Sequence, residues 1–211
     1  MSNLLFIGGG KGGTTKSTTA HLLCLGAILS KQPAAYVLTD PNRDMKPDGR
    51  PYSVLDGRDG NNLAQIIMAS SNSGNGWLII DGAGNRPAFD KAVSAQADLT
   101  LLPFRDAQED VDTVLKDLSA MPAAFAWPTA WPTNKLAAQA AQKYLDQVRA
   151  AFPLRVVQPP LSFVNSAKSL MDTILGEPST EVRREARRAF AIMAGWFEDH
   201  QQTDQPAALS A

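Results

Sequence analysis

A glycine-rich loop near the start of the chain combines two lysines with four hydroxyl side chains. Residues 10–18 read GKGGTTKST and lie between an apolar run at residues 4–8 and a helical pattern at residues 17–29. Glycines let successive backbone N–H groups converge on phosphate oxygens, and the N-terminus of a following helix adds partial positive charge. The spacing matches G-x-x-x-x-G-K-[ST] except at one position. We therefore predict a nucleotide phosphate site formed by Gly10, Lys11, Gly12, Gly13, Thr14, Thr15, Lys16, Ser17 and Thr18.

Individual residues of this loop have separate predicted tasks. We expect Lys16 to act as a catalytic cation that reaches the β- and γ-phosphates of ATP, and the Ser17 hydroxyl to ligate Mg²⁺. Thr15 stands where the pattern has glycine, and a β-branched residue resists a positive φ. Either the loop holds a negative φ at Thr15, or the affinity for nucleotide is reduced. An ordinary phosphate loop has no use for Lys11.

Two acidic residues follow predicted strands. Asp81 ends the buried run WLIID, and a carboxylate at the end of such a strand holds Mg²⁺ in P-loop ATPases, usually through water. The next residues read GAG, and we expect Gly84 to let the backbone approach a γ-phosphate. Asp40 follows a shorter strand at residues 36–39. We predict that Asp40 is catalytic by orienting the attacking water, or that it holds a magnesium-bound water.

Apolar runs and helical patterns alternate along the chain, which is typical of a parallel sheet with helices on both faces. We predict an α/β fold of the P-loop NTPase type, with a mostly parallel twisted sheet. The expected strands lie at residues 4–8, 36–39, near 52–55, 77–80, 99–103, 123–127 and 155–157. The expected helices lie at residues 17–29, 63–69, 111–118, 135–151, 166–175 and 180–198. One domain would cover residues 1–199, and the polar tail at 200–211 is expected to be disordered.

The composition excludes several classes of protein. The chain has 211 residues, a formal net charge of −1 and a single cysteine, Cys24. One cysteine excludes a disulfide framework within the chain and favours a reducing, cytoplasmic setting. No run approaches the ~18 apolar residues of a membrane span. Because the net charge is near zero, any surface that binds nucleic acid must be local.

Four motifs together resemble the ParA/MinD family of ATPases. The loop GKGGTTKST resembles the family's deviant Walker A loop, K-G-G-x-x-K-[ST]-T, and TDPN at residues 39–42 resembles its switch I. LIIDGAG at residues 78–84 resembles Walker B and switch II, and ADLTLLPFRDAQEDV at residues 97–111 is similar to the stretch that follows in ParA proteins. The resemblance covers roughly residues 3–175. It implies that Lys11 reaches across a nucleotide-sandwich dimer to the phosphates of the partner's ATP, and so couples ATP binding to dimerisation.

The resemblance also implies an activity and partners. Members bind Mg-ATP, dimerise with ATP, bind DNA non-specifically and hydrolyse ATP slowly until a ParB-like or cargo-linked protein stimulates them. We therefore expect a cytoplasmic, nucleoid-associated protein that segregates a plasmid or chromosome or positions a cargo. The chain departs from the family at Leu38, where the first acid of D-x-D-P is missing. We expect no N-terminal helix-turn-helix domain, as in small ParA proteins, and no membrane helix of the MinD kind.

A basic helix near the C-terminus is the candidate DNA-binding surface. At 100° per residue, the apolar residues of segment 180–198 share one face. In ParA-like proteins, basic residues in this part of the chain bind DNA, and such an array can neutralise several phosphates. The alternative is a solvated face with Glu/Arg pairs. The arginines on the opposite face are Arg183, Arg184, Arg187 and Arg188.

Three other functions stay open from the sequence. Thr15 and Leu38 are compatible with a nucleotide-gated binding module that hydrolyses negligible ATP. A conjugation-linked ParA relative would carry the same motifs. A metabolic or redox member of the fold is less well supported, because the single cysteine cannot hold an iron–sulfur cluster and no substrate site is evident.

Overall fold

The computed structural model describes residues 2–72, 74–172 and 176–203. Within them, six strands form one sheet in the order β3-β2-β4-β1-β5-β6, and every pairing is parallel, as predicted. The strands are β1 (Asn3–Ile7), β2 (Ala34–Leu38), β3 (Ser53–Asp56), β4 (Trp77–Asp81), β5 (Leu99–Phe104) and β6 (Ala124–Pro128). Because parallel strands all point the same way, their carboxyl ends share one edge of the sheet, where ligands bind in open α/β folds.

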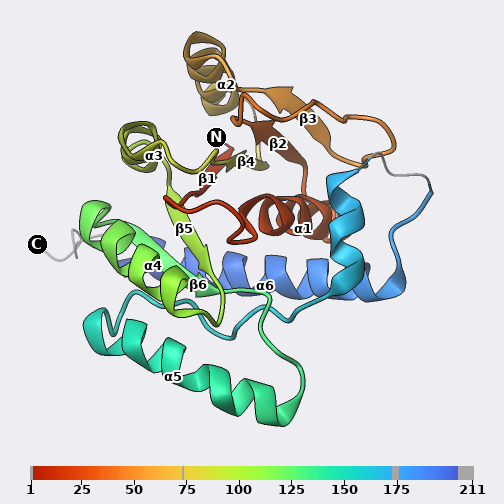
Figure 1. Ribbon diagram of the computed structural model, residues 1–211. Coiled ribbons are helices and arrows are strands. Elements are labelled where there is room, and N and C mark those ends of the chain that lie inside the picture. Colours follow the sequence, from red (N-terminus) through yellow and green to blue (C-terminus); the bar gives the residue numbers. More distant parts are fainter. Residues whose placement is uncertain (1, 73, 173–175, 204–211) are drawn as a thin grey trace, which may run out of the picture.

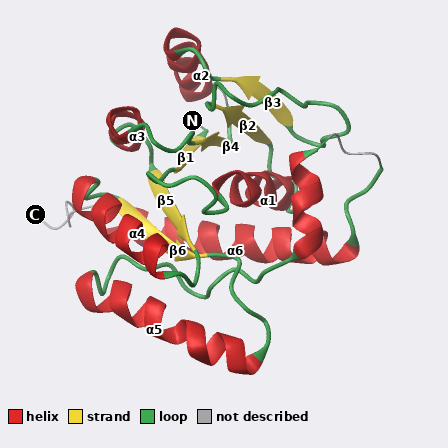
Figure 2. Cartoon of the chain, in the orientation of Figure 1, coloured by secondary structure: helices red, strands yellow, loops and turns green. Residues whose placement is uncertain are grey.

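Helices cover both faces of this sheet (Figure 1). One face packs against α1 (Lys16–Leu29), α6 (Thr180–Thr203) and the 3₁₀ helix η1 (Asn165–Met171). The other face is covered by α2 (Gly60–Asn72), α3 (Pro87–Ser94), α4 (Gln108–Ala120) and α5 (Lys135–Ala151). Figure 2 shows the resulting layers of helix, strand and helix. None of the described helices is both long and apolar enough to cross a membrane.

Alternation along the strands divides the core in two. On β1, Leu5 and Ile7 face the layer of α1 and α6, whereas Leu4 and Phe6 face α2 and α3. Successive side chains of a strand point to opposite faces. Both faces are buried, so the central strands are apolar at nearly every position, which is the pattern that predicted them.

Close packing of α1 on α6 fixes the helix that follows the phosphate loop. A Cβ added at Gly26 of α1 would lie 2.1 Å from the carbonyl oxygen of Ala186 on α6, so only glycine permits this approach. The predicted apolar face of α6 is buried against this layer, through Val182, Ala186, Ala189, Phe190, Met193 and Phe197.

Two expected elements differ in the structure, and one helix was not expected. The strand predicted at residues 155–157 is wrong: only a bridge between Ala126 and Val156 forms, because Pro159 and Pro160 have no N–H to continue the pairing. The helix predicted at residues 166–175 is the 3₁₀ helix η1, and residues 173–175 lie outside the described part. Helix α3 was not predicted, because its eight residues hold too few apolar side chains to show a helical period.

The predicted C-terminal tail overlaps the last helix. Helix α6 continues to Thr203, whereas residues 204–211 lie outside the described residues.

Candidate nucleotide and magnesium site

The phosphate loop joins β1 to α1 at the carboxyl edge of the sheet. A cavity of about 400 Å³ opens above the loop. It collects residues predicted from three separate motifs, the phosphate loop, TDPN and the segment after β4, and these are Gly12, Gly13, Thr15, Lys16, Ser17, Thr18, Asp40, Gly82 and Ala83. Arg105, Ala130, Phe163, Lys168 and Met171 complete its wall together with Arg43. The structure therefore brings most of the predicted phosphate-binding residues together around one space, whereas Gly10, Lys11, Thr14 and Gly84 are not among the residues that line it.

Lys16 is the most buried cation of the loop. Its Nζ donates a hydrogen bond to the carbonyl oxygen of Lys11 at 2.7 Å, and only 7% of the residue is exposed. Burial lowers the pKa of Lys16, while the carboxylates of Asp81, Asp90 and Asp117 oppose that shift. Gly84 has a φ of +68°, and a Cβ there would lie 3.2 Å from Lys16 Nζ. Glycine at this position thus lets the segment after β4 lie directly against the lysine.

Thr15 adopts a left-handed backbone conformation, with φ 71° and ψ 10°. The alternative that the loop holds a negative φ here is therefore wrong. The Thr15 hydroxyl lies 2.6 Å from that of Thr129 at the end of β6, and it also contacts the Thr14 carbonyl oxygen. The backbone carbonyl of Thr15 accepts the first bond of α1, from Thr19 N at 2.8 Å. A β-branched residue is strained at this φ, so the bond to Thr129 offsets part of a real cost.

Asp81 lies almost completely buried beneath the loop. Tyr36 donates to its Oδ2 at 2.6 Å, but its Oδ1 has no hydrogen-bond partner among the described residues. Burial raises the pKa of Asp81, against hydrogen bonds from Ser17 and Tyr36 that lower it. An unpartnered buried carboxylate oxygen beside a serine hydroxyl is a suitable pair of ligands for a hard cation.

The residues present fit Mg²⁺ in particular. Ser17, Asp40 and Asp81 offer only oxygen donors, and Mg²⁺ typically takes one or two carboxylates together with water and phosphate oxygens. No cluster of three or more His, Cys, Asp or Glu side chains that could hold a metal occurs within the described ranges. A metal here would therefore take its other ligands from water and, once nucleotide is bound, from its phosphates.

Arg43 lies among these three metal-ligand candidates and was missed by the sequence analysis. Its Nη1 donates to Ser17 Oγ at 2.5 Å and lies 3.9 Å from Asp81 Oδ2. Its Nε lies 3.7 Å from Asp40 Oδ2. The one available signal was its place directly after TDPN, which says nothing about where the side chain points.

Lys11 is held by its own chain. Its Nζ lies 2.7 Å from Asp110 Oδ1 and 2.8 Å from Glu109 Oε2, in the first turn of α4. Hydrogen bonds to Asp110 and then to Glu109 raise the pKa of Lys11. Burial alone would raise the pKa of Asp110, but hydrogen bonds from Arg105 and Lys11 hold it below its ordinary value. Lys11 is therefore a paired cation, and any new partner must replace two carboxylates.

Two further carboxylates support the loop from the other face of the sheet. Asp90 on α3 accepts a bond from Gly9 N at 3.4 Å, and Asp117 on α4 accepts one from Gly10 N at 2.8 Å. Burial raises the pKa of Asp90 to about 6 and also raises the pKa of Asp117. No sequence signal distinguishes these residues from ordinary acids on a helix surface. Gly10 thus anchors the loop and does not line the cavity.

The four arginines of α6 fall into two pairs. Arg183 pairs with Glu177 at 2.6 Å, and Arg188 pairs with Glu185 at 2.8 Å and donates to the Pro160 carbonyl oxygen. Arg184 and Arg187 are exposed and make no hydrogen bond or ion pair within the described chain. None of the four lines the cavity above the phosphate loop.

Comparison with known proteins finds likeness in structure only. No family model and no curated protein matches the sequence. The ATP complex of a McdA variant from Cyanothece is 18% identical, covers 92% of this chain and 96% of its own, and gives a TM-score of 0.61. Cobyrinic acid a,c-diamide synthase from Mycobacterium smegmatis, solved with ADP and magnesium, is 16% identical. The match covers 93% of this chain and 96% of that enzyme, with a TM-score of 0.64.

The cell division protein MinD from Aquifex aeolicus is 15% identical, with coverage of 99% of this chain and 100% of its own and a TM-score of 0.64. At these identities the likeness establishes the fold and not the activity. The chain has the α/β fold of the ParA/MinD-type deviant Walker A ATPases.

Proposed function

We propose that this protein is a ParA-like ATPase that binds Mg-ATP, forms an ATP-dependent dimer and binds DNA without sequence preference. Slow hydrolysis, stimulated by a ParB-like or cargo-linked partner, would drive segregation or positioning. The observation that carries the proposal is the cavity at the carboxyl edge of the sheet, where Lys16, Ser17 and Asp40 meet directly above Asp81. Fold likeness to McdA and MinD supports the same class.

Nucleotide binding follows from the loop geometry. Gly12 and Gly13 line the cavity, where glycine backbone N–H groups can bind phosphate oxygens, and Lys16 would supply a buried cation for the β- and γ-phosphates. Beside them, a small, mainly apolar pocket of about 80 Å³, lined in part by Leu22, Phe163 and Val164, offers apolar contact for an edge of the base. Two proteins with this fold have been solved with nucleotide, one with ATP and the other with ADP and magnesium.

Magnesium would be held by Ser17, Asp81 and Asp40. Once bound, it would neutralise charge on the phosphates. The metal would be bound by Asp81 Oδ1, which lacks a partner among the described residues. The Tyr36 hydroxyl donates to Oδ2 and so fixes the orientation of the carboxylate. Asp40 lies at the mouth of the same cavity, where it can accept a proton from water.

Dimerisation would use Lys11. In the single chain its ammonium group is bound to Glu109 and Asp110, so it must leave α4 to reach a second protomer's phosphate. For that exchange, phosphate oxygens of the partner's ATP would replace both carboxylates as charge-assisted acceptors of the Lys11 ammonium. A partner-binding role has a parallel in MinD, which has been solved in complex with MinC.

DNA binding would rest on Arg184 and Arg187 more than on their neighbours. These two side chains are exposed and unpaired within the described residues, whereas Arg183 and Arg188 already hold acids. A dimer would present the array twice, so ATP could switch DNA binding through avidity.

The test is DNA binding against salt with ATP, ADP or no nucleotide. We expect DNA binding with ATP only, and loss of that binding in Lys11→Ala. In Arg184→Glu/Arg187→Glu, the slope of log affinity against log salt should become shallower by about one unit for each phosphate that is no longer neutralised. Lys135→Glu/Lys143→Glu makes the same charge change on α5, on the other face of the sheet, and should leave binding unchanged. Equal loss in both double variants would contradict a specific role for α6.

A nucleotide-gated binding module with negligible hydrolysis is the second candidate. The strained Thr15 and the contact between Arg43 and Ser17 favour it, because both alter the place where Mg²⁺ and the phosphates would be held for hydrolysis. Phosphate release measured with ATP and DNA distinguishes the two. Tight ATP binding without release in the presence of a cognate partner would select this candidate.

A further inference from the structure

We propose that Arg43 acts as an internal substitute for the magnesium ion, holding the metal ligands in place until Mg²⁺ and nucleotide displace it. The inference rests on the proposed function, since it takes Ser17, Asp40 and Asp81 as metal ligands. It adds a role for a residue outside every motif that predicted the site.

Geometry is the first argument. One guanidinium group contacts all three candidate ligands, at 2.5 Å to Ser17 Oγ, 3.7 Å to Asp40 Oδ2 and 3.9 Å to Asp81 Oδ2. These groups come from α1 and from the ends of two different strands, so one positive charge bridges three elements. A divalent cation bound to Ser17, Asp40 and the unpartnered Oδ1 of Asp81 would bring a second positive charge to the same three side chains, and its arrival would displace the guanidinium.

Charge is the second argument. Asp81 is 1% exposed, and a buried carboxylate without a compensating cation is costly. Lys16 is close enough to interact with Asp81, but its Nζ is bonded to the Lys11 carbonyl oxygen. Arg43 is therefore the cation that bridges Asp81 to Ser17 and Asp40. Its side chain is 41% exposed, so it can exchange for an ion from solvent without opening the core.

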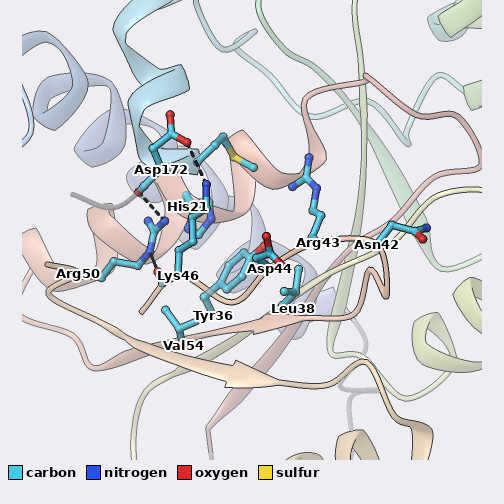
Figure 3. Close-up of a pocket in the computed structure, with 11 residues that line it drawn as sticks. His21, Tyr36, Leu38, Asn42, Arg43, Asp44, Lys46, Arg50, Val54 and Asp172 are labelled. Atoms are coloured by element: carbon cyan, nitrogen blue, oxygen red, sulfur yellow. Dashed lines mark hydrogen bonds and ion pairs between the residues drawn. The ribbon is translucent and has the colours of Figure 1, made fainter. Parts of the chain in front are cut away.

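The loop that carries Arg43 is tethered at its other end. Arg50 donates to the carbonyl oxygens of Leu170 at 2.7 Å and Asp172 at 3.1 Å, and Lys46 pairs with the Asp172 carboxylate at 3.1 Å. Figure 3 shows the contacts of Arg50 and Lys46 with Asp172 at one end of a pocket, with Arg43 set apart from them. Release of Arg43 would therefore leave the rest of the loop attached to η1.

Space for the displaced side chain lies beside it. A second cavity of about 330 Å³, lined by His21, Tyr36, Asn42 and Asp44, also includes Arg43 in its wall. Asp44 offers a carboxylate there for the displaced guanidinium. The exchange would thus need only a rotation of the Arg43 side chain. Metal binding would then change the contacts of the loop that follows β2.

The experiment measures Mn²⁺ binding by electron paramagnetic resonance in the nucleotide-free protein, comparing wild type with Arg43→Gln. The variant keeps a side chain of similar length and removes the charge. We expect it to bind Mn²⁺ at least about tenfold more tightly, which corresponds to about 1.4 kcal/mol. Lys46→Ala removes one charge from the same loop without touching the three oxygens, so its Mn²⁺ affinity should match wild type.

A second arm follows a fluorescent ADP analogue as Mg²⁺ is titrated. Arg43→Gln should reach half-saturation at about tenfold less Mg²⁺ and should bind the analogue more weakly in EDTA, because no cation then faces the two carboxylates. Equal or weaker Mn²⁺ affinity in Arg43→Gln would overturn the inference, whatever the nucleotide result. Failure of every variant to bind nucleotide would refute the proposed function alone, because the Mn²⁺ arm needs no nucleotide.

Discussion

The left-handed conformation of Thr15 allows a sharp test of how strain and hydrogen bonding balance in the phosphate loop. Its φ of 71° places a β-branched side chain in a region that costs roughly 1–2 kcal/mol for any residue with a Cβ. Thr15→Gly removes that cost. It also removes the hydroxyl bond to Thr129, worth about 0.5–1.5 kcal/mol, and adds about 0.5–1 kcal/mol of chain entropy to the unfolded state.

These contributions nearly cancel, so we expect Thr15→Gly to unfold within about 1 kcal/mol of wild type. Thr15→Ala keeps the strained φ and loses the hydroxyl, and should be less stable by about 1 kcal/mol. The expected order of stability is therefore glycine and threonine together, then alanine. ATP affinity should rise in the glycine variant, because no Cβ then crowds the phosphates.

Urea unfolding at constant m-value measures these differences. Lys31 is the matched control, because its φ is 61°, it is exposed, and no hydrogen bond or ion pair of its side chain occurs within the described residues. Lys31→Gly should therefore stabilise the protein by about 0.5–1 kcal/mol, with no bond to lose. The reasoning fails if Thr15→Ala proves as stable as Thr15→Gly, since strain at a positive φ would then have no measurable weight.

Three other predictions test the packing and charge of the scaffold. Gly26→Ala should lower the unfolding free energy by at least about 2 kcal/mol, because the α6 backbone occupies the space that the new Cβ would need. Gly195→Ala, where no atom lies within 4 Å of the added Cβ, should be neutral or stabilising. Thermal unfolding compares the two variants. The pKa of Asp90 is about 6 when folded, against 3.8 unfolded, so wild-type stability should fall as pH rises from about 4 to 6. Asp90→Asn should flatten that slope in urea unfolding at several pH values. Arg188→Ala should cost about 3 kcal/mol by leaving a buried glutamate unpaired, and Arg184→Ala less than about 0.5 kcal/mol, both by urea unfolding.

The sequence alone predicted the strands that are buried on both faces of the sheet, and it predicted which residues stand at their ends. Asp40 and Asp81 could be placed at one edge because parallel strands bring their carboxyl ends together. Helix α5 was predicted at its observed bounds, because an amphipathic helix of 17 residues has a strong period. The phosphate loop could be predicted from the order and spacing of its glycines and lysines alone.

Contacts between distant parts of the chain could not be predicted in the same way. The partners of Lys11 on α4 and of Gly10 at Asp117 lie 98 or more residues away, on helices whose acids look like ordinary surface residues. Likewise, helical periodicity placed Arg188 on the solvent side of α6 but could not reveal its bond to the Pro160 carbonyl oxygen. Register along one element is local, whereas the pairing of charges depends on how elements pack.

The two lysines of the phosphate loop are bound to oxygens of their own chain, and this affects how a phosphate can bind. Lys16 donates to the carbonyl oxygen of Lys11, and the Lys11 side chain in turn holds Asp110. A phosphate that draws the Lys16 ammonium towards itself would weaken the first of these bonds, which is one of the interactions that fix the backbone of Lys11. Because the two bonds share one residue, phosphate binding at Lys16 lowers the cost of moving Lys11 away from α4. Coupling between the two lysines therefore follows from their hydrogen bonds within a single chain, before any second protomer is present.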